Sequence, residues 1–145
     1  MSKADADRVR LDEIELFSKS ELFSRMRKAK KIWRELRFNV RLPADRFTED
    51  KERKEAYKNE TVLVQGVIDC IIEDESGELH LVDYKTDRLT KDELQCEELA
   101  REKLSFSHAL QLSYYKDAIR EIFGKLPKTA GVYSLPLGKT LEIDC

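Results

Sequence analysis

The sequence predicts an α/β domain built on a mixed sheet with flanking helices. Its 145 residues are the size of one domain, and residues 1–145 are expected to form it as a single unit. Short apolar runs typical of strands occur both before and after one long stretch with helical periodicity. The expected order is two helices, three strands, a helix and two strands, which favours a mixed sheet.

The composition is that of a soluble globular protein. The hydrophobic set makes up 41% of the residues, the charged set makes up 39%, and the formal net charge is −2. No apolar run reaches the roughly 18 residues of a membrane span, and no signal peptide is recognisable. The three cysteines are scattered and have no metal-binding or disulfide spacing. We therefore expect a cytoplasmic protein without a membrane partner.

The N-terminal part is expected to be helical after a polar end formed by residues 1–10. Apolar residues recur at helical spacing in residues 11–17 and predict a short helix. A second helix should follow, capped by Ser18 or Ser20 and burying apolar side chains as far as Met26.

A basic segment overlaps the second helix and the first strand. Residues 19–41 hold nine Lys or Arg but only two Glu. Such a segment can contact phosphates, or it can be an ordinary solvated face, and the composition favours neither interpretation.

The first predicted strand covers Ile32–Val40 and ends at Pro43. Strand alternation would place Trp33, Glu35 and Arg37 on the same face. Glu35 would then lie off the more apolar face of the strand.

A long polar loop is expected over residues 44–60, with room for one helical turn at the surface. Two runs rich in Val, Ile and Leu follow, Thr61–Ile72 and Leu79–Lys85, and predict a β-hairpin. A three-residue loop, Glu75–Gly77, with Gly77 in the left-handed conformation would fix the register of this hairpin.

That register places Asp69 opposite Asp83, with Lys85 on the same face as Asp83. Like charges facing each other destabilise a sheet, and buried carboxylates are rare unless they are paired or bound to a metal. A divalent cation held by carboxylate oxygens would explain the pattern. An Asp–Lys ion pair on a solvated sheet face would explain it equally well.

The C-terminal third is expected to hold a helix and two strands. Residues 88–104 are typical of loop and weak helix, 105–123 of a strong helix ended by Gly124, and 129–135 and 140–143 of strands. The expected inner stripe of the helix consists of Leu110, Tyr114, Ala118 and Ile122.

Three motifs together resemble a known family. Thirteen residues separate Asp69 from Asp83-Tyr84-Lys85, and Gln65-Gly66 precede the first aspartate. The other motifs are Arg34-Glu35-x-x-Phe38 upstream and Gln111-Leu112-x-x-Tyr115 downstream. In this order they resemble the RecB family of PD-(D/E)XK nucleases, in particular the C-terminal nuclease domain of AddA-type helicase–nucleases. The resemblance covers nearly the whole chain and implies a restriction-endonuclease-like mixed sheet flanked by helices.

The resemblance implies a metal-dependent DNA exonuclease that uses Mg²⁺, with Mn²⁺ as an alternative ion. Glu35, Asp69 and Asp83 would be metal ligands, together with the backbone carbonyl of Tyr84. Lys85 would lie near the attacking water and the scissile phosphate. These four side chains would form the catalytic set, because a bound divalent ion and a positioned amine suit phosphodiester hydrolysis.

The resemblance also implies that Gln111 and Tyr115 contact the substrate, since residues four apart share a helix face. His80 is expected to be structural, because it alternates with Val82 on the face opposite Asp83. His108 is expected to open the helix as a surface residue.

The histidines depart from the family pattern. Members usually carry a His on a helix upstream of the Glu motif, whereas both His residues of this chain follow Glu35. No Walker motif is present. The expectation is a C-terminal fragment of a larger helicase–nuclease of double-strand-break repair and recombination. Its partners would be DNA, preferentially single-stranded, the helicase portion and an AddB-like protein. The alternatives are a non-catalytic DNA-binding or scaffolding domain and a stand-alone restriction-like endonuclease.

Overall fold

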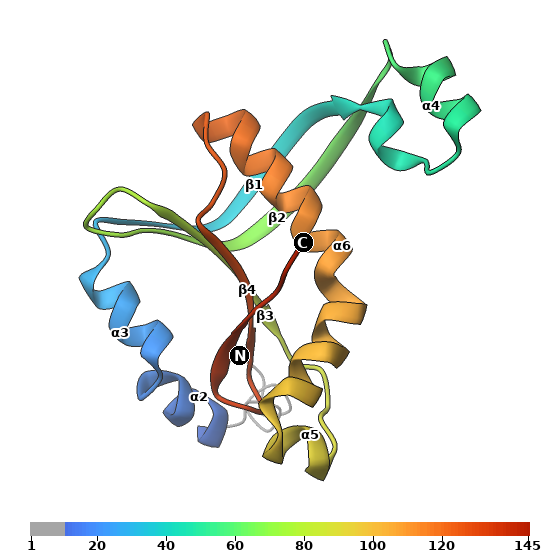
Figure 1. Ribbon diagram of the computed structural model, residues 1–145. Coiled ribbons are helices and arrows are strands. Elements are labelled where there is room, and N and C mark those ends of the chain that lie inside the picture. Colours follow the sequence, from blue (N-terminus) through green and yellow to red (C-terminus); the bar gives the residue numbers. More distant parts are fainter. Residues whose placement is uncertain (1–10) are drawn as a thin grey trace, which may run out of the picture.

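The computed structural model describes residues 11–145, so the polar end expected over residues 1–10 lies outside the described part. Within residues 11–145 the sheet has five strands in the order β1-β2-β3-β4-β5. Neighbouring strands are antiparallel except β3 and β4, which are parallel. The predicted α/β fold with a mixed sheet is therefore confirmed (Figure 1). The elements are α2 Leu11–Ser18, α3 Glu21–Lys28, β1 Lys31–Pro43, η1 Ala44–Phe47, α4 Lys51–Tyr57, β2 Thr61–Glu73, β3 Leu79–Lys85, α5 Lys91–Gln95, α6 Glu97–Phe123, β4 Thr129–Ser134 and β5 Lys139–Glu142.

Helices cover the sheet from both sides. Helix α6 crosses one face, and α2 and α3 lie on the other (Figure 1). Each face has its own core: Ile71 and Leu81 pack on the α6 side, whereas Cys70 and Val82 pack on the α3 side. Helix α3 begins as predicted, with the Ser20 hydroxyl accepting a hydrogen bond from the backbone N–H of Phe23 at 3.1 Å. None of the described helices is long and apolar enough to span a membrane.

The β2–β3 hairpin has the predicted three-residue loop. Gly77 has a φ of +82°, and the backbone N–H of Asp74 donates to the carbonyl of Glu78 at 3.0 Å. The paired residues end with Cys70 opposite Val82, and the next position in this register places Asp69 opposite Asp83. The register predicted from the sequence is thus confirmed.

The alternation predicted for the first strand is wrong at Glu35. This residue has a φ of +50°, and it is skipped in the ladder between the pairs Arg34–Cys70 and Leu36–Ile68. The left-handed residue turns the following side chains over, so Trp33 and Leu36 both pack toward α6. Trp33 therefore does not share a face with Arg37, which is exposed.

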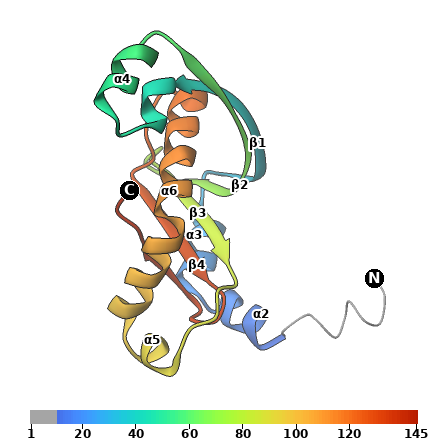
Figure 2. The same cartoon turned by 90° about the vertical axis from the view of Figure 1, so that its right-hand side faces the viewer.

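Beyond this point β1 and β2 continue as a two-stranded ribbon, formed by residues 36–43 and 61–68. The ribbon rises away from the rest of the sheet and runs alongside the C-terminal half of α6 (Figures 1 and 2). Its end is closed by η1 and α4, so the segment expected as a long loop is largely helical. Asp50 caps α4 by accepting hydrogen bonds from the N–H groups of Glu52 and Arg53.

Helix α6 is longer than the sequence suggested. It begins at Glu97, and α5 precedes it with a capping box between Thr90 and Glu93. The predicted stripe is wrong, because Leu110 and Ile122 are 65% and 45% exposed. The side chains of α6 that are buried in the core are Ala100, Leu104, Leu112, Ala118 and Ile119. Gly124, with a φ of +75°, ends the helix as predicted.

Candidate active site

The site predicted from the sequence lies where β2 separates from β3. Beyond the Cys70–Val82 pair, the Asp69 carboxylate accepts a hydrogen bond from the backbone N–H of Tyr84 at 3.0 Å. A side chain thus satisfies a donor that the strand ladder would otherwise have satisfied. This fork, defined here by Asp69 on β2 and Asp83 to Lys85 on β3, also positions the two carboxylates beside each other.

Asp83 is the most deeply placed charged group of the fork. It is 2% exposed, and Nζ of Lys85 lies 2.7 Å from its Oδ2. This oxygen is buried without a well-aligned hydrogen bond, so Lys85 meets it as an ion pair. The Asp–Lys ion pair, one of the two explanations that the sequence left open, is therefore present, but its carboxylate is buried instead of solvated.

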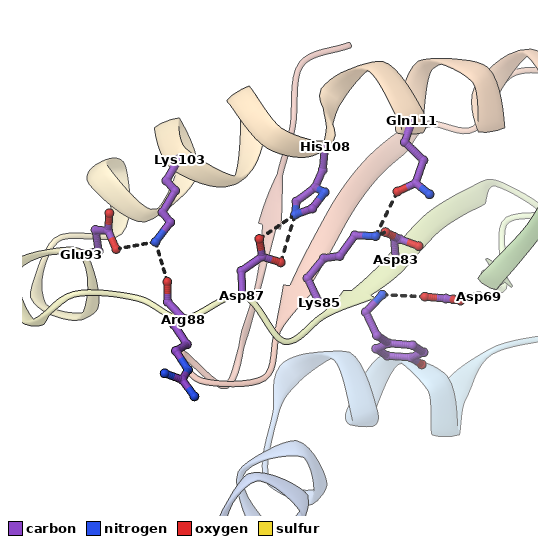
Figure 3. A network of polar contacts seen from close by, with 10 residues as sticks. Asp69, Asp83, Lys85, Asp87, Arg88, Glu93, Lys103, His108 and Gln111 are labelled. Carbon is purple, nitrogen blue, oxygen red and sulfur yellow. Dashed lines mark hydrogen bonds and ion pairs between the residues drawn. The ribbon is translucent and has the colours of Figure 1, made fainter.

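Helix α6 completes the polar cluster. Lys85 Nζ donates to Oε1 of Gln111 at 2.9 Å, and the Gln111 amide nitrogen donates to the Tyr115 hydroxyl at the same distance. Figure 3 shows Lys85 reaching from β3 between Asp83 and Gln111. The structure thus brings together Asp69, Asp83, Lys85, Gln111 and Tyr115 from three elements.

Burial and like charge both act on the cluster. Burial raises the pKa of the Asp83 carboxyl, the Lys85 ammonium opposes that shift, and the neighbouring Asp69 adds to it. Burial also raises the pKa of the Tyr115 phenol, and the negative charges of Asp83 and Asp69 raise it further. The fork is therefore a place where added positive charge would be stabilised.

Glu35 is placed differently from the other predicted residues. The register sets it opposite Asp69, but its side chain is exposed. Its left-handed backbone is uncommon for a residue other than glycine, and such conformations cluster at functional sites. The structure therefore positions Glu35 at the rim of the fork.

The donor set fits a divalent cation in part. Two carboxylates side by side, one with a buried oxygen that lacks an aligned hydrogen bond, are the oxygen ligands that Mg²⁺ and Ca²⁺ take. Within residues 11–145 no group of three or more His, Cys, Asp or Glu side chains converges to hold a metal ion. Asp69 and Asp83 could thus hold an ion with the adjacent Tyr84 carbonyl, while Glu35 would have to turn inward to join them.

Two polar contacts that the sequence did not predict hold the segment after β3 against α6. Nε2 of His108 lies 3.0 and 3.1 Å from the two oxygens of Asp87, and Lys103 binds the carbonyl oxygen of Arg88 (Figure 3). His108 was expected to open a helix at the surface; instead it lies within α6, and its side chain is 16% exposed. The signal available in the sequence was Asp87 itself, two residues after Lys85.

His80 is structural, as predicted. It is buried, and its Nδ1 lies 2.8 Å from Oγ1 of Thr129, whereas its Nε2 lies 2.8 Å from Oδ2 of Asp74. The imidazole therefore ties β3 to the start of β4 and to the hairpin loop.

Comparison with known proteins decides the family. The model of the PD-(D/E)XK nuclease superfamily matches residues 3–142. The chain belongs to the PD-(D/E)XK nuclease superfamily. Nucleases of this superfamily generally use divalent metal ions, in agreement with the paired carboxylates of the fork.

Similar curated proteins are much longer than this PD-(D/E)XK chain. The A subunit of an ATP-dependent helicase/nuclease from Clostridium novyi (strain NT) is 34% identical over 143 residues, which cover 99% of this chain and 11% of that protein. The protein of the same name from Thermoanaerobacter sp. (strain X514) is 33% identical over 142 residues, covering 98% of this chain and 11% of its own length. One from Clostridium botulinum (strain 657 / Type Ba4) is 34% identical over 128 residues, covering 88% and 9%. The chain thus spans about a tenth of the length of these relatives.

Proposed function

We propose that this chain is a metal-dependent DNA exonuclease domain that hydrolyses phosphodiester bonds with Mg²⁺, for which Mn²⁺ can substitute. The observation that carries this proposal is the convergence of Asp69, Asp83 and Lys85 at the fork. The family and the helicase/nuclease names of the relatives support the reaction class.

The proposed metal ligands are Asp69, Asp83, the backbone carbonyl of Tyr84 and Glu35. The two aspartates are already adjacent, and the desolvated Asp83 carboxylate would gain most from a cation. Glu35 faces Asp69 in the register and is the remaining acidic ligand of the proposed set. A bound divalent ion would supply charge neutralisation at the phosphate and acidify a water.

Lys85 is proposed to position the attacking water or to accept its proton. Its Nζ lies between Asp83 and Gln111, so it is oriented by groups on two elements. Gln111 and Tyr115 form the proposed substrate-binding pair, because their hydrogen bond aims both polar groups of α6 at the fork. Together these side chains fix the geometry that hydrolysis requires.

The proposed setting is a cytoplasmic helicase–nuclease that acts in double-strand-break repair and recombination. The names of the relatives combine a helicase and a nuclease, and the chain matches about a tenth of their length. We infer that the chain corresponds to the C-terminal nuclease portion of such a protein. Its proposed partners are single-stranded DNA, the helicase portion and an AddB-like protein.

A non-catalytic DNA-binding or scaffolding domain is the second candidate. The observation that favours it is the exposed Glu35, which is not drawn into a three-carboxylate group within the described residues. The two candidates differ in whether the fork binds a metal ion.

Calorimetry with Mg²⁺ and with Mn²⁺ tests the proposal directly. The native chain is expected to bind metal, and Asp83→Asn and Asp69→Asn should each weaken binding strongly, because each removes one anionic ligand. Asp92→Asn is the matched control, since Asp92 is exposed on α5. Unchanged affinity in both fork variants would exclude this metal site and favour the scaffolding domain.

A further inference from the structure

The ribbon has one face that nothing in the described structure covers. Its inner face packs on α6 through Phe38, Val40 and Ile68. Its outer face consists of three cross-strand pairs, all six side chains of which are exposed: Arg37–Val67, Asn39–Gln65 and Arg41–Leu63.

Both arginines of this outer face are unpaired. Within residues 11–145, Arg37 and Arg41 make no ion pair, hydrogen bond or ring contact. Three other arginines of the described chain, Arg46, Arg101 and Arg120, are each bound to a carboxylate and are not free in this way. In a chain of net charge −2, the outer face carries two free guanidinium groups and no acidic side chain.

The outer face leads to the fork. Arg41, Asn39 and Arg37 follow one another along β1, and Glu35, two residues before Arg37 in the chain, lies at the rim of the fork. In Figure 2 the ribbon lies along the right-hand side of the molecule with α6 to its left, and the end of β3 points to the same side. The extended strand from Arg41 to Glu35 spans roughly 20 Å, enough to pass several phosphates.

A polyanion with polar bases complements this surface. Guanidinium groups bind phosphate oxygens in a bidentate manner, and the amides of Asn39 and Gln65 can donate and accept hydrogen bonds with bases or sugars. Leu63 and Val67 offer apolar contact beside them. A single strand suits the fork better than a duplex, because the scissile phosphate must reach beside Asp83, which is only 2% exposed.

We propose that the outer face of the ribbon is a binding track for single-stranded DNA, which it guides into the fork. The proposal rests on the nuclease function proposed above and adds the path of the substrate. The strand would run along β1 with its phosphates at Arg41 and Arg37, and it would enter the fork past Glu35.

The test is the salt dependence of DNA binding without metal. A fluorescein-labelled oligothymidylate is titrated with the protein in EDTA at several salt concentrations, and binding is followed by anisotropy. The double variant Arg37→Gln/Arg41→Gln should lower the slope of log Kobs against log salt by about 1.4, since each phosphate contact with single strands contributes about 0.7. This corresponds to roughly tenfold weaker binding at physiological salt.

Two further variants make the test specific to this face. The matched control is Lys125→Gln/Lys128→Gln, which removes the same charge from the loop between α6 and β4 and should leave the slope nearly unchanged. Val67→Lys adds a charge beside Arg37 and should raise the slope by about 0.7. If the double variant fails to fold by circular dichroism, Val67→Lys and Arg41→Gln alone decide the question.

Several results would overturn the track. One is an unchanged slope for the double variant, which would show that Arg37 and Arg41 contact no phosphate. Another is an equal loss of slope in the control, and a third is an equal or greater loss with a duplex probe. Because EDTA removes metal, the binding assay is independent of the calorimetry. If the native chain binds metal but the double variant leaves the salt slope unchanged, only the track is rejected. If the double variant lowers the salt slope but the native chain binds no metal, only the nuclease function is rejected.

Discussion

A substitution at Lys85 can distinguish metal binding from the chemical step of cleavage. It meets Asp83 at 2.7 Å and Gln111 at 2.9 Å, and neither contact needs a metal ion. Lys85→Met keeps the length of the side chain but removes the amine. We expect metal affinity in the native range and cleavage of single-stranded DNA slower by about 10²–10⁴, the range for loss of a general base.

Lys103→Met is the control for Lys85→Met. Lys103 is a partly buried amine away from the fork, and it donates to the backbone carbonyl of Arg88 and to the carboxylate of Glu93. Metal affinity is measured by calorimetry and cleavage on a labelled strand. Cleavage at the native rate by the Lys85 variant would reduce Lys85 to an ion-pair partner of Asp83.

The Asp74 carboxylate is expected to contribute to stability in a way that depends on pH. The hydrogen bond from His80, followed by the N–H groups of the hairpin loop, lowers the pKa of its carboxyl. A carboxyl with a lowered folded-state pKa stabilises the fold above its unfolded pKa of about 3.9, and the contribution is lost as the pH falls through the folded value. Asp74→Asn should therefore lower the urea midpoint at pH 7 and make the decline below about pH 4 shallower.

The measurement for Asp74→Asn is urea unfolding at a series of pH values, with Asp92→Asn as the exposed control. Parallel pH profiles for native and Asp74→Asn proteins would show that the His80 contact does not contribute to folding.

The three family motifs meet in one packing contact between the ribbon and α6. Phe38 lies opposite Gly66, where an added Cβ would come within 2.7 Å of its ring. The same ring packs edge-to-face on Tyr115 with centroids 5.8 Å apart, and Tyr115 accepts the hydrogen bond from Gln111. Gly66, just before the first aspartate of the nuclease motif, is thus required by Phe38 of the upstream motif and by Tyr115 of the downstream motif.

Gly66→Ala should therefore displace the Phe38 ring and, through it, Tyr115. We expect a loss of about 1–3 kcal/mol in the free energy of unfolding, typical of overpacking a core, together with slower cleavage. The double variant Gly66→Ala/Phe38→Leu relieves the clash and should recover part of the stability. Chemical denaturation measures both, and native stability of Gly66→Ala alone would contradict the packing argument.

The elements that the sequence predicted well are those governed by local rules. The β2–β3 hairpin was predictable because a glycine at the left-handed loop position fixes its register, and that register pairs Asp69 with Asp83. The orientation of Glu35 could not be predicted, because nothing in the alternation of apolar residues indicates a glutamate with a left-handed backbone. The predicted start of α6 at residue 105 was eight residues too late. The first turns of the helix are largely polar and bury only Ala100 and Leu104, so they lack the apolar periodicity that marks a helix.

The chain as a separate protein is expected to be a weak nuclease. No His lies upstream of Glu35, and this glutamate is exposed, so water reaches the rim of the fork and weakens charge interactions there. On the track proposed above, DNA affinity would depend on Arg37 and Arg41, so we expect it to fall as the salt concentration rises. Cleavage of labelled single-stranded DNA with Mn²⁺ at physiological salt should be far slower than by a full-length helicase/nuclease such as the Clostridium novyi relative.

The cleavage assay should include the segment of that relative that matches this chain and a version extended upstream. If all of these proteins have equal specific activity, Glu35, Asp69, Asp83 and Lys85 form a complete site without further polypeptide. The helicase portion would then contribute nothing to the chemical step.

The connection between the parallel strands β3 and β4 sets the order in which the fork is assembled. Strands β1, β2 and β3 follow one another as a meander, so each closes a shorter loop than the β3–β4 pair, which must wait for α5 and α6. We therefore expect Asp69 and Asp83 to meet early in folding, while Gln111 arrives when α6 docks. During that interval the Asp69 and Asp83 carboxylates are offset only by Lys85 of β3. Divalent ions in the refolding buffer should therefore accelerate the first phase and leave the docking of α6 unchanged.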